Sequence, residues 1–135
     1  MTQEVLNGLE IDLRDPLTLA RSCAAILDEK KVADLALIDV GNSLAITNYF
    51  LVGTGLNPRH LQSAVDHLER FLREGGIRPR GVEGYRDGKW VLLDLGDVVV
   101  HLFLAESRQF YDLELLWGDA VRADIALVPR RQAVT

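Results

Sequence analysis

A glycine-rich loop and two nearby carboxylates are the residues whose types and spacing could perform chemistry. Gly53-Thr54-Gly55 follows an apolar run and precedes a helical pattern, a place where backbone N–H groups can hold a phosphate. No Lys-Ser or Lys-Thr pair follows the loop, so it is not a Walker sequence. Asp94 and Asp97 are candidate ligands for the divalent metal that phosphoryl transfer uses. Metal-dependent transfer of a nucleotide is therefore the first chemistry to consider.

The loop resembles the glycine-serine loop of nucleotidyltransferases, with Thr54 in the hydroxyl position, but the carboxylates lack the required spacing. Two metal ligands on one strand must be two residues apart to share a face. Asp94 and Asp97 are three apart across a turn. Asp112 and Glu114 are two apart in a predicted helix, where such neighbours do not face each other. We therefore expect no catalytic residues, no metal site and no cofactor, and a loop that only turns the chain.

The histidines and the cysteine offer no other chemistry. His60, His67 and His101 have no cysteine or second histidine at the spacing of metal ligands. Cys23 lies in an apolar helical pattern and, as a single cysteine, cannot form an internal disulfide. A buried free thiol is expected, which fits a reducing compartment.

The elements that position these residues alternate between helix and strand. A first helix is predicted to begin at Asp15-Pro16 and to run to about Leu27, because Asp caps and Pro suits the first turn. A second helix is predicted from Asn57-Pro58 to Gly75-Gly76. The remaining predictions are strands over 35–40, 49–52, 78–83, 90–93 and 98–103, and a helix over 106–116. This order predicts an α/β fold, a single compact domain with a mixed β-sheet flanked by helices.

The length and the hydropathy of the chain set its organisation. A chain of 135 residues fits one domain. We predict a weakly ordered arm over 1–14, the domain over 15–121 and a tail over 122–135. The longest apolar runs are too short to cross a bilayer, and the first ten residues lack the pattern of a signal peptide. We therefore expect a cytoplasmic protein with no place in a membrane.

The segment 83–119 combines negative charge with aromatic side chains. It holds eight acidic and three basic residues, so the whole net charge of −5 lies within it. Such a segment repels phosphate backbones and attracts basic surfaces. Aromatic residues that could anchor a protein partner also lie here, namely Tyr85, Trp90, Phe110, Tyr111 and Trp117. Aromatic anchors among acids are typical of a surface for a basic protein, although both tryptophans could instead belong to the core.

Several blocks of the chain resemble a known family in order and spacing. They are NYFLVGTG (48–55), PRHLQSAV (58–65), EGY (83–85), WVLLDLGDVVVHLF (90–103) and RQFYDLELLWGDA (108–120). Over residues 15–121 the chain resembles the ribosomal silencing factor family, also called the Iojap-related family. Asn48 stands where members commonly carry Asp, and Leu56-Asn57 where small hydroxyl residues are usual. Both departures lie near the glycine loop and argue against a ligand role for it.

The resemblance implies a fold similar to that of nucleotidyltransferases and a function without covalent chemistry. It implies binding to the large ribosomal subunit through large-subunit ribosomal protein fourteen, which sterically blocks subunit joining and represses translation. We expect the same of this chain, with no direct nucleic-acid specificity. The expected docking residues lie in the hairpin and beside it: Tyr85, Trp90, Asp94, Leu95, Asp97 and Tyr111.

Trp90 and Leu95 carry the argument for this surface. Trp90 opens a strand beside the turn 84–89, and Leu95 is an apolar residue at a turn that is usually polar. The competing account places Trp90 in the core and folds Leu95 back on the sheet. Two other interpretations stay open, namely a metal-dependent nucleotidyltransferase that uses Thr54, Asp94 and Asp97, and a structural homodimer with no ribosomal role.

Overall fold

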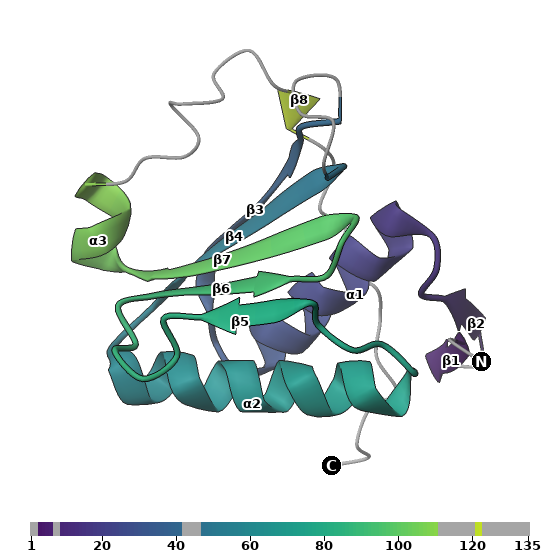
Figure 1. The fold of residues 1–135 in the computed structure, drawn as a ribbon, viewed down its shortest axis with the longest axis horizontal. Coiled ribbons are helices and arrows are strands. Elements are labelled where there is room, and N and C mark those ends of the chain that lie inside the picture. Colours follow the sequence, from purple (N-terminus) through teal and green to yellow (C-terminus); the bar gives the residue numbers. More distant parts are fainter. Residues whose placement is uncertain (1–2, 7–8, 42–46, 111–120, 123–135) are drawn as a thin grey trace.

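The computed structural model of this protein describes residues 3–6, 9–41, 47–110 and 121–122 (Figure 1). In chain order the elements are β1 (Gln3–Leu6), β2 (Leu9–Asp12), α1 (Pro16–Glu29), β3 (Ala33–Asp39), β4 (Tyr49–Gly55), α2 (Pro58–Glu74), β5 (Gly81–Glu83), β6 (Trp90–Asp94), β7 (Val98–Leu104), α3 (Ala105–Phe110) and β8 (Val121–Arg122). Among these helices, none combines the length and the apolarity that crossing a membrane needs.

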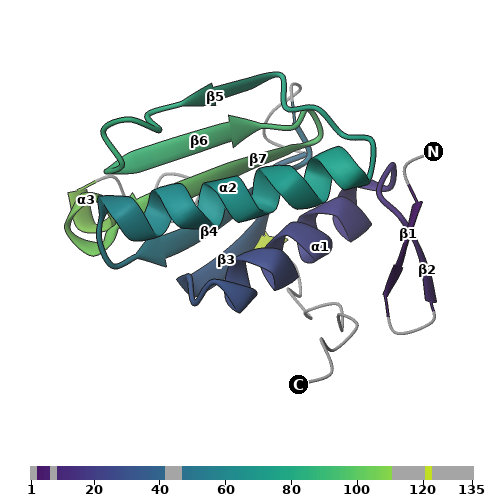
Figure 2. The same ribbon diagram turned by 90° about the horizontal axis from the view of Figure 1, so that it is seen from below.

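The main sheet has the strand order β5-β6-β7-β4-β3-β8. The pair β4 and β7 is parallel, with Tyr49 beside Val98, and the other pairs are antiparallel. Helices α1 and α2 lie together across one face of this sheet, and α3 follows the end of β7 (Figures 1 and 2). The predicted fold class, an α/β domain with a mixed sheet flanked by helices, is confirmed.

The two long helices begin at the predicted caps. Oδ2 of Asp15 accepts hydrogen bonds from the backbone N–H of Thr18 at 2.9 Å and from its hydroxyl at 2.7 Å. Oδ1 of Asn57 accepts from the backbone N–H of His60 at 2.8 Å. In each case a proline occupies the first turn, where its missing N–H costs nothing. Local chemistry therefore fixes where α1 and α2 start.

The hydrophobic core has two parts, one on each face of the sheet. The larger cluster fills the space between the sheet and α1 and α2, and we call it the inner cluster. The smaller cluster lies on the opposite face, which we call the outer face; its buried members are Ile38, Val40, Phe50, Val52 and Phe103. Cys23 lies in the inner cluster, and burial raises the pKa of its thiol to about 12. The prediction of a buried free thiol is confirmed.

Two short strand pairs lie outside the predicted elements. β1 and β2 pair with each other over Gln3–Leu6 and Leu9–Asp12, within the predicted arm. In the sequence between them, the Asn7-Gly8 dipeptide is typical of a hairpin. β8 adds a two-residue edge strand beside β3. Of the helix predicted over 106–116, α3 covers Ala105–Phe110, and the rest lies outside the described residues.

Candidate functional site

The hairpin of β6 and β7 closes with a turn that Asp94 organises. Oδ1 of Asp94 accepts a hydrogen bond from the N–H of Gly96 at 2.9 Å, and the N–H of Leu95 donates to the carbonyl of Val98 at 2.9 Å. Gly96 has φ of +89°, a left-handed conformation that other residues adopt only with strain. A Cβ there would also approach the guanidinium of Arg80 to 3.3 Å. The guanidinium of Arg80 therefore lies against Gly96 at the tip of the hairpin.

The outer face carries the exposed part of the hairpin. Residues two apart on a strand share a face, and the pairing of β6 with β7 and of β7 with β4 fixes which residues share this one. Those from β6 and β7 are Trp90, Leu92, Asp94, Val99, His101 and Phe103. Within this set, four are partly buried, namely Trp90, Leu92, Asp94 and Val99. The outer face thus presents both apolar surface and a carboxylate.

Trp90 is held on the outer face by two ring contacts. Its indole packs on Phe103 with ring centroids 4.9 Å apart. Its Nε1–H donates a hydrogen bond to Nδ1 of His101 at 3.2 Å. Burial lowers the pKa of His101 to about 4, so this ring is neutral at physiological pH. Sequence spacing gave His101 no role as a metal ligand; the register of the hairpin, which sets it diagonal to Trp90, is the signal that points to this contact.

The predicted docking residues divide between the two faces of the sheet. Trp90 and Asp94 lie on the outer face. Tyr85 and Leu95 are partly buried and pack against the inner cluster, on the side of the helices. Asp97 is exposed at the hairpin tip, where its carbonyl accepts from Asn48 and Tyr49.

These positions refine the predicted surface. Leu95 folds back as the competing account expected, whereas Trp90 is neither fully exposed nor fully buried. Tyr111 lies outside the described residues. The described part of the acidic segment, 83–110, contains five acidic and three basic residues. The surface around the hairpin is therefore mildly acidic, with Arg80 beside it.

The glycine loop and the carboxylates lie at opposite ends of the sheet. On β7, Thr54 is level with Phe103 and Asp94 with Val99. Four residues of strand separate these positions by about 13 Å. The structure therefore does not bring together the residues of the nucleotidyltransferase alternative. Elsewhere in the described ranges, no three His, Cys, Asp or Glu side chains gather as a metal site would need.

Packing accounts for the glycines of the loop. A Cβ on Gly53 would come within 2.6 Å of Val32, and one on Gly55 would collide with Leu61 of α2. The next N–H, that of Leu56, donates to Nδ1 of His60 at 2.9 Å. The loop is therefore shaped to let α2 pack closely on β4, which fits the expectation that it only turns the chain.

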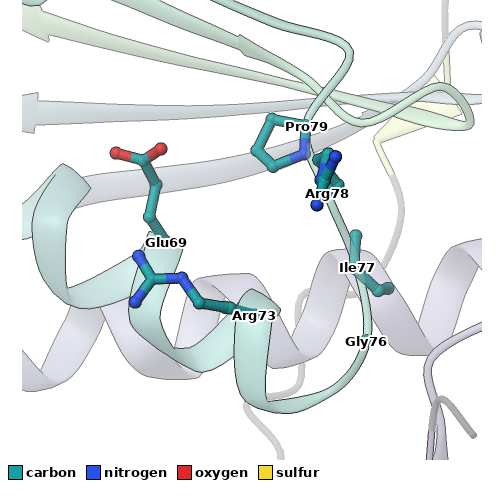
Figure 3. A pocket seen from close by; sticks show the side chains of 6 residues that line it. All are labelled: Glu69, Arg73, Gly76, Ile77, Arg78 and Pro79. Atoms are coloured by element: carbon teal, nitrogen blue, oxygen red, sulfur yellow. The ribbon is translucent and has the colours of Figure 1, made fainter.

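Two pockets lie away from the outer face. One, of about 340 Å³, lies where α2 ends and the chain turns toward β5 (Figure 3); its lining is Glu69, Arg73, Gly76, Ile77, Arg78 and Pro79. The other, of about 420 Å³, lies at the start of α2 and is lined by Glu29, Lys30, Lys31, Asn57, Arg59, His60 and Ser63. Both contain cationic side chains and neither contains a predicted docking residue.

Known proteins are similar to this chain in sequence and in fold. A sequence profile described as "Ribosomal silencing factor during starvation" matches residues 14–135. This chain is similar to the "Ribosomal silencing factor RsfS" of Bacillus subtilis (strain 168), with 36% identity over 108 residues that cover 80% of this chain and 92% of that protein. It is also similar to the Mus musculus "Mitochondrial assembly of ribosomal large subunit protein 1", with 32% identity that covers 69% of this chain and 42% of that protein.

Two solved structures are similar in fold to this chain. A crystal structure from Bacillus halodurans superposes with a TM-score of 0.70 at 31% identity, covering 78% of this chain and 96% of that one. One from Chromobacterium violaceum superposes with a TM-score of 0.72 at 31% identity, covering 82% and 91%. The match of the profile to most of the chain, together with these relatives, shows that the chain belongs to the ribosomal silencing factor family.

Proposed function

We propose that this protein represses translation by binding the large ribosomal subunit and blocking the joining of the small one. The supporting observation is membership in the ribosomal silencing factor family. A mouse relative is named for assembly of the ribosomal large subunit, which supports this choice of subunit. Steric exclusion needs no catalytic group, and a domain of 15.0 kDa is large enough to occupy part of a joining surface. Its place of action is then the cytoplasm.

We further propose that the outer face of the β6–β7 hairpin docks on large-subunit ribosomal protein fourteen. Trp90 is the central anchor, since a partly exposed tryptophan offers large contact area and an ordered ring. Asp94 lies on the same face and Asp97 at the hairpin tip, where carboxylates speed the approach of a basic protein. Tyr85 and Leu95 pack on the helix side of the sheet, so we propose that their exposed parts meet the partner only at the edge of this surface. Tyr111 remains a predicted member outside the described residues.

Sedimentation with purified ribosomal subunits tests this function. We expect the protein to sediment with isolated large subunits and not with small ones, and to shift mixed subunits away from the joined form. Equal binding to both subunits, or normal joining at saturating protein, would refute the proposal. Binding to neither subunit, with a stable dimer in solution, would favour the structural homodimer instead.

A further inference from the structure

His101 is a buried side chain in direct contact with Trp90. Its side chain lies on the outer face with 5% of its surface exposed. In the hairpin, Leu92 is directly opposite His101, and Trp90 is opposite Phe103. Trp90 and His101 are therefore diagonal neighbours on one face, a separation that an indole can span. The 3.2 Å hydrogen bond from Nε1 of Trp90 to Nδ1 of His101 bridges that diagonal.

The hydrogen bond fixes which nitrogen of His101 carries the proton. Nδ1 accepts from the indole, so in the neutral ring the proton lies on Nε2. That Nε2–H is buried and has no hydrogen-bond partner among the described residues. A buried donor without an acceptor costs stability, and a phenylalanine ring would avoid this cost. The unpaired Nε2–H thus offsets the hydrogen bond that Nδ1 accepts from Trp90, so stability alone does not account for a histidine at this position.

Two phenylalanines set the direction of the histidine ring. Phe50 meets it edge-on, with centroids 4.8 Å apart and planes at 69°. Phe103 lies parallel to it, with centroids 6.2 Å apart and planes at 7°. A ring held from two sides directs its Nδ1 lone pair along one line. The indole of Trp90 has a single N–H. Only one of the two flipped orientations of this ring points that N–H at Nδ1, so the hydrogen bond selects that orientation.

We propose that His101 is the positioning residue of the docking surface: it holds the indole of Trp90 in one orientation before the partner arrives. This inference rests on the proposed docking role of Trp90. An anchor that is already ordered loses less side-chain freedom on binding, so the complex is tighter without any new contact. His101 is buried and contacts Trp90, so it affects binding through the indole and does not itself touch the partner.

Two substitutions of His101 distinguish the effect of its Nδ1 acceptor from the effect of its aromatic ring. His101→Phe removes the acceptor and keeps an aromatic ring between Phe50 and Phe103. His101→Asn loses the ring and keeps a side-chain acceptor near the place of Nδ1. Each variant is measured in three ways: thermal melting, affinity for isolated large subunits, and the indole N–H signal of Trp90 in a proton–nitrogen correlation spectrum. Trp90→Phe assigns that signal, since the chain has two tryptophans.

The positioning role predicts opposite effects on stability and on binding. His101→Phe should melt at or above the temperature of the wild-type protein, bind large subunits about three- to tenfold more weakly, and shift the indole signal. His101→Asn should recover part of both the binding and the signal. When Trp90 is already Phe, adding His101→Phe should cause no further loss of binding, because no indole N–H remains to be oriented.

Two results would overturn this inference and leave the proposed docking surface intact. The first is normal binding by His101→Phe although the indole signal moves. The second is an equal loss of binding when Trp90 is already Phe, since His101 would then act by another route. In both cases Trp90→Ala still binds poorly. If Trp90→Ala binds like the wild-type protein, the proposed docking surface fails, and the positioning role fails with it.

Discussion

The hydroxyl of Tyr85 donates a hydrogen bond to Oδ1 of Asp66 at 2.8 Å, which fastens the turn before β6 to α2. The side-chain amide of Gln62 adds a second link, donating to the carbonyl of Tyr85 at 2.9 Å. In the same turn Gly88 has φ of +67° and lies so close to Pro58 that a Cβ would meet it at 2.6 Å. The start of β6 is therefore held from the helix side, directly before Trp90 projects from the other face.

The first prediction concerns this fastening. Tyr85→Phe should lower the melting temperature by a few degrees at most, because it removes one partly exposed hydrogen bond. Its binding to large subunits should stay within about twofold of the wild-type affinity, since the exposed ring remains. Tyr49→Phe is the matched control, because the hydroxyl of Tyr49 makes no hydrogen bond to any described residue. A large loss of binding in Tyr85→Phe would instead place the hydroxyl itself in the interface.

The second prediction concerns the anchor. Trp90→Ala should weaken binding to large subunits by about 2 kcal/mol or more, roughly thirtyfold, because it removes the largest side chain of the outer face. The variant should still unfold cooperatively, since Trp90 is only partly buried beside Phe103. Ile77→Ala is the control: it truncates another partly buried apolar residue, but one on the helix side of the molecule. Equal binding by the two variants would contradict a docking role for the outer face.

Local signals in the sequence predicted the helix starts and the hairpin well. Asp15-Pro16 and Asn57-Pro58 cap α1 and α2 because a cap depends on a few consecutive residues. The hairpin of β6 and β7 follows from two apolar runs and a turn, which are equally local.

The side of the sheet on which each candidate residue lies could not be predicted in the same way. The place of Tyr85 depends on how the turn 84–89 crosses α2, which is a tertiary property. Leu95 packs against the inner cluster because the helices lie on that side of the sheet. The contact of Trp90 with His101 needs the exact register of two strands, since a slip of one residue would send the side chains to opposite faces.

The third prediction concerns the carboxylate at the hairpin tip. Asp97→Asn should slow association with large subunits at low salt, and the difference from the wild-type protein should shrink as salt screens the charge. Glu74→Gln removes another exposed carboxylate, at the end of α2 on the helix side of the sheet, and should change the rate little. The measurement is stopped-flow association across a salt series. Similar slowing in both variants would mean that only net charge matters.

The fourth prediction concerns the enzymatic alternative. Magnesium and each nucleotide, added together, should give no turnover and no heat of binding. Thr54 and Asp94 are too far apart along the sheet to share one phosphate and its metal. Isothermal calorimetry and product analysis measure both quantities, with Asp94→Ala as the comparison. Metal-dependent turnover that Asp94→Ala abolishes would revive the nucleotidyltransferase interpretation.

The last prediction concerns the pH dependence of stability that His101 causes. Burial lowers the pKa of His101 from 6.5 to about 4 in the folded protein. Between these values the unfolded chain binds a proton that the folded protein does not, so stability must rise with pH across this window. The contribution is fully present above pH 6.5 and is lost as pH falls toward 4. The full loss is about 3 kcal/mol, given about 1.4 kcal/mol for each pKa unit.

Denaturant unfolding at several pH values measures this contribution as a difference between the wild-type protein and His101→Phe. Groups that are the same in both proteins cancel in this comparison. Relative to the variant, the wild-type protein should lose stability steadily from pH 6.5 down to 4, and the two curves should run parallel above 6.5. Parallel curves at all pH values would show that His101 takes up a proton as readily in the folded protein as in the unfolded chain. Because Nε2 already carries a proton, the second proton would go to Nδ1 and remove the acceptor of the Trp90 hydrogen bond.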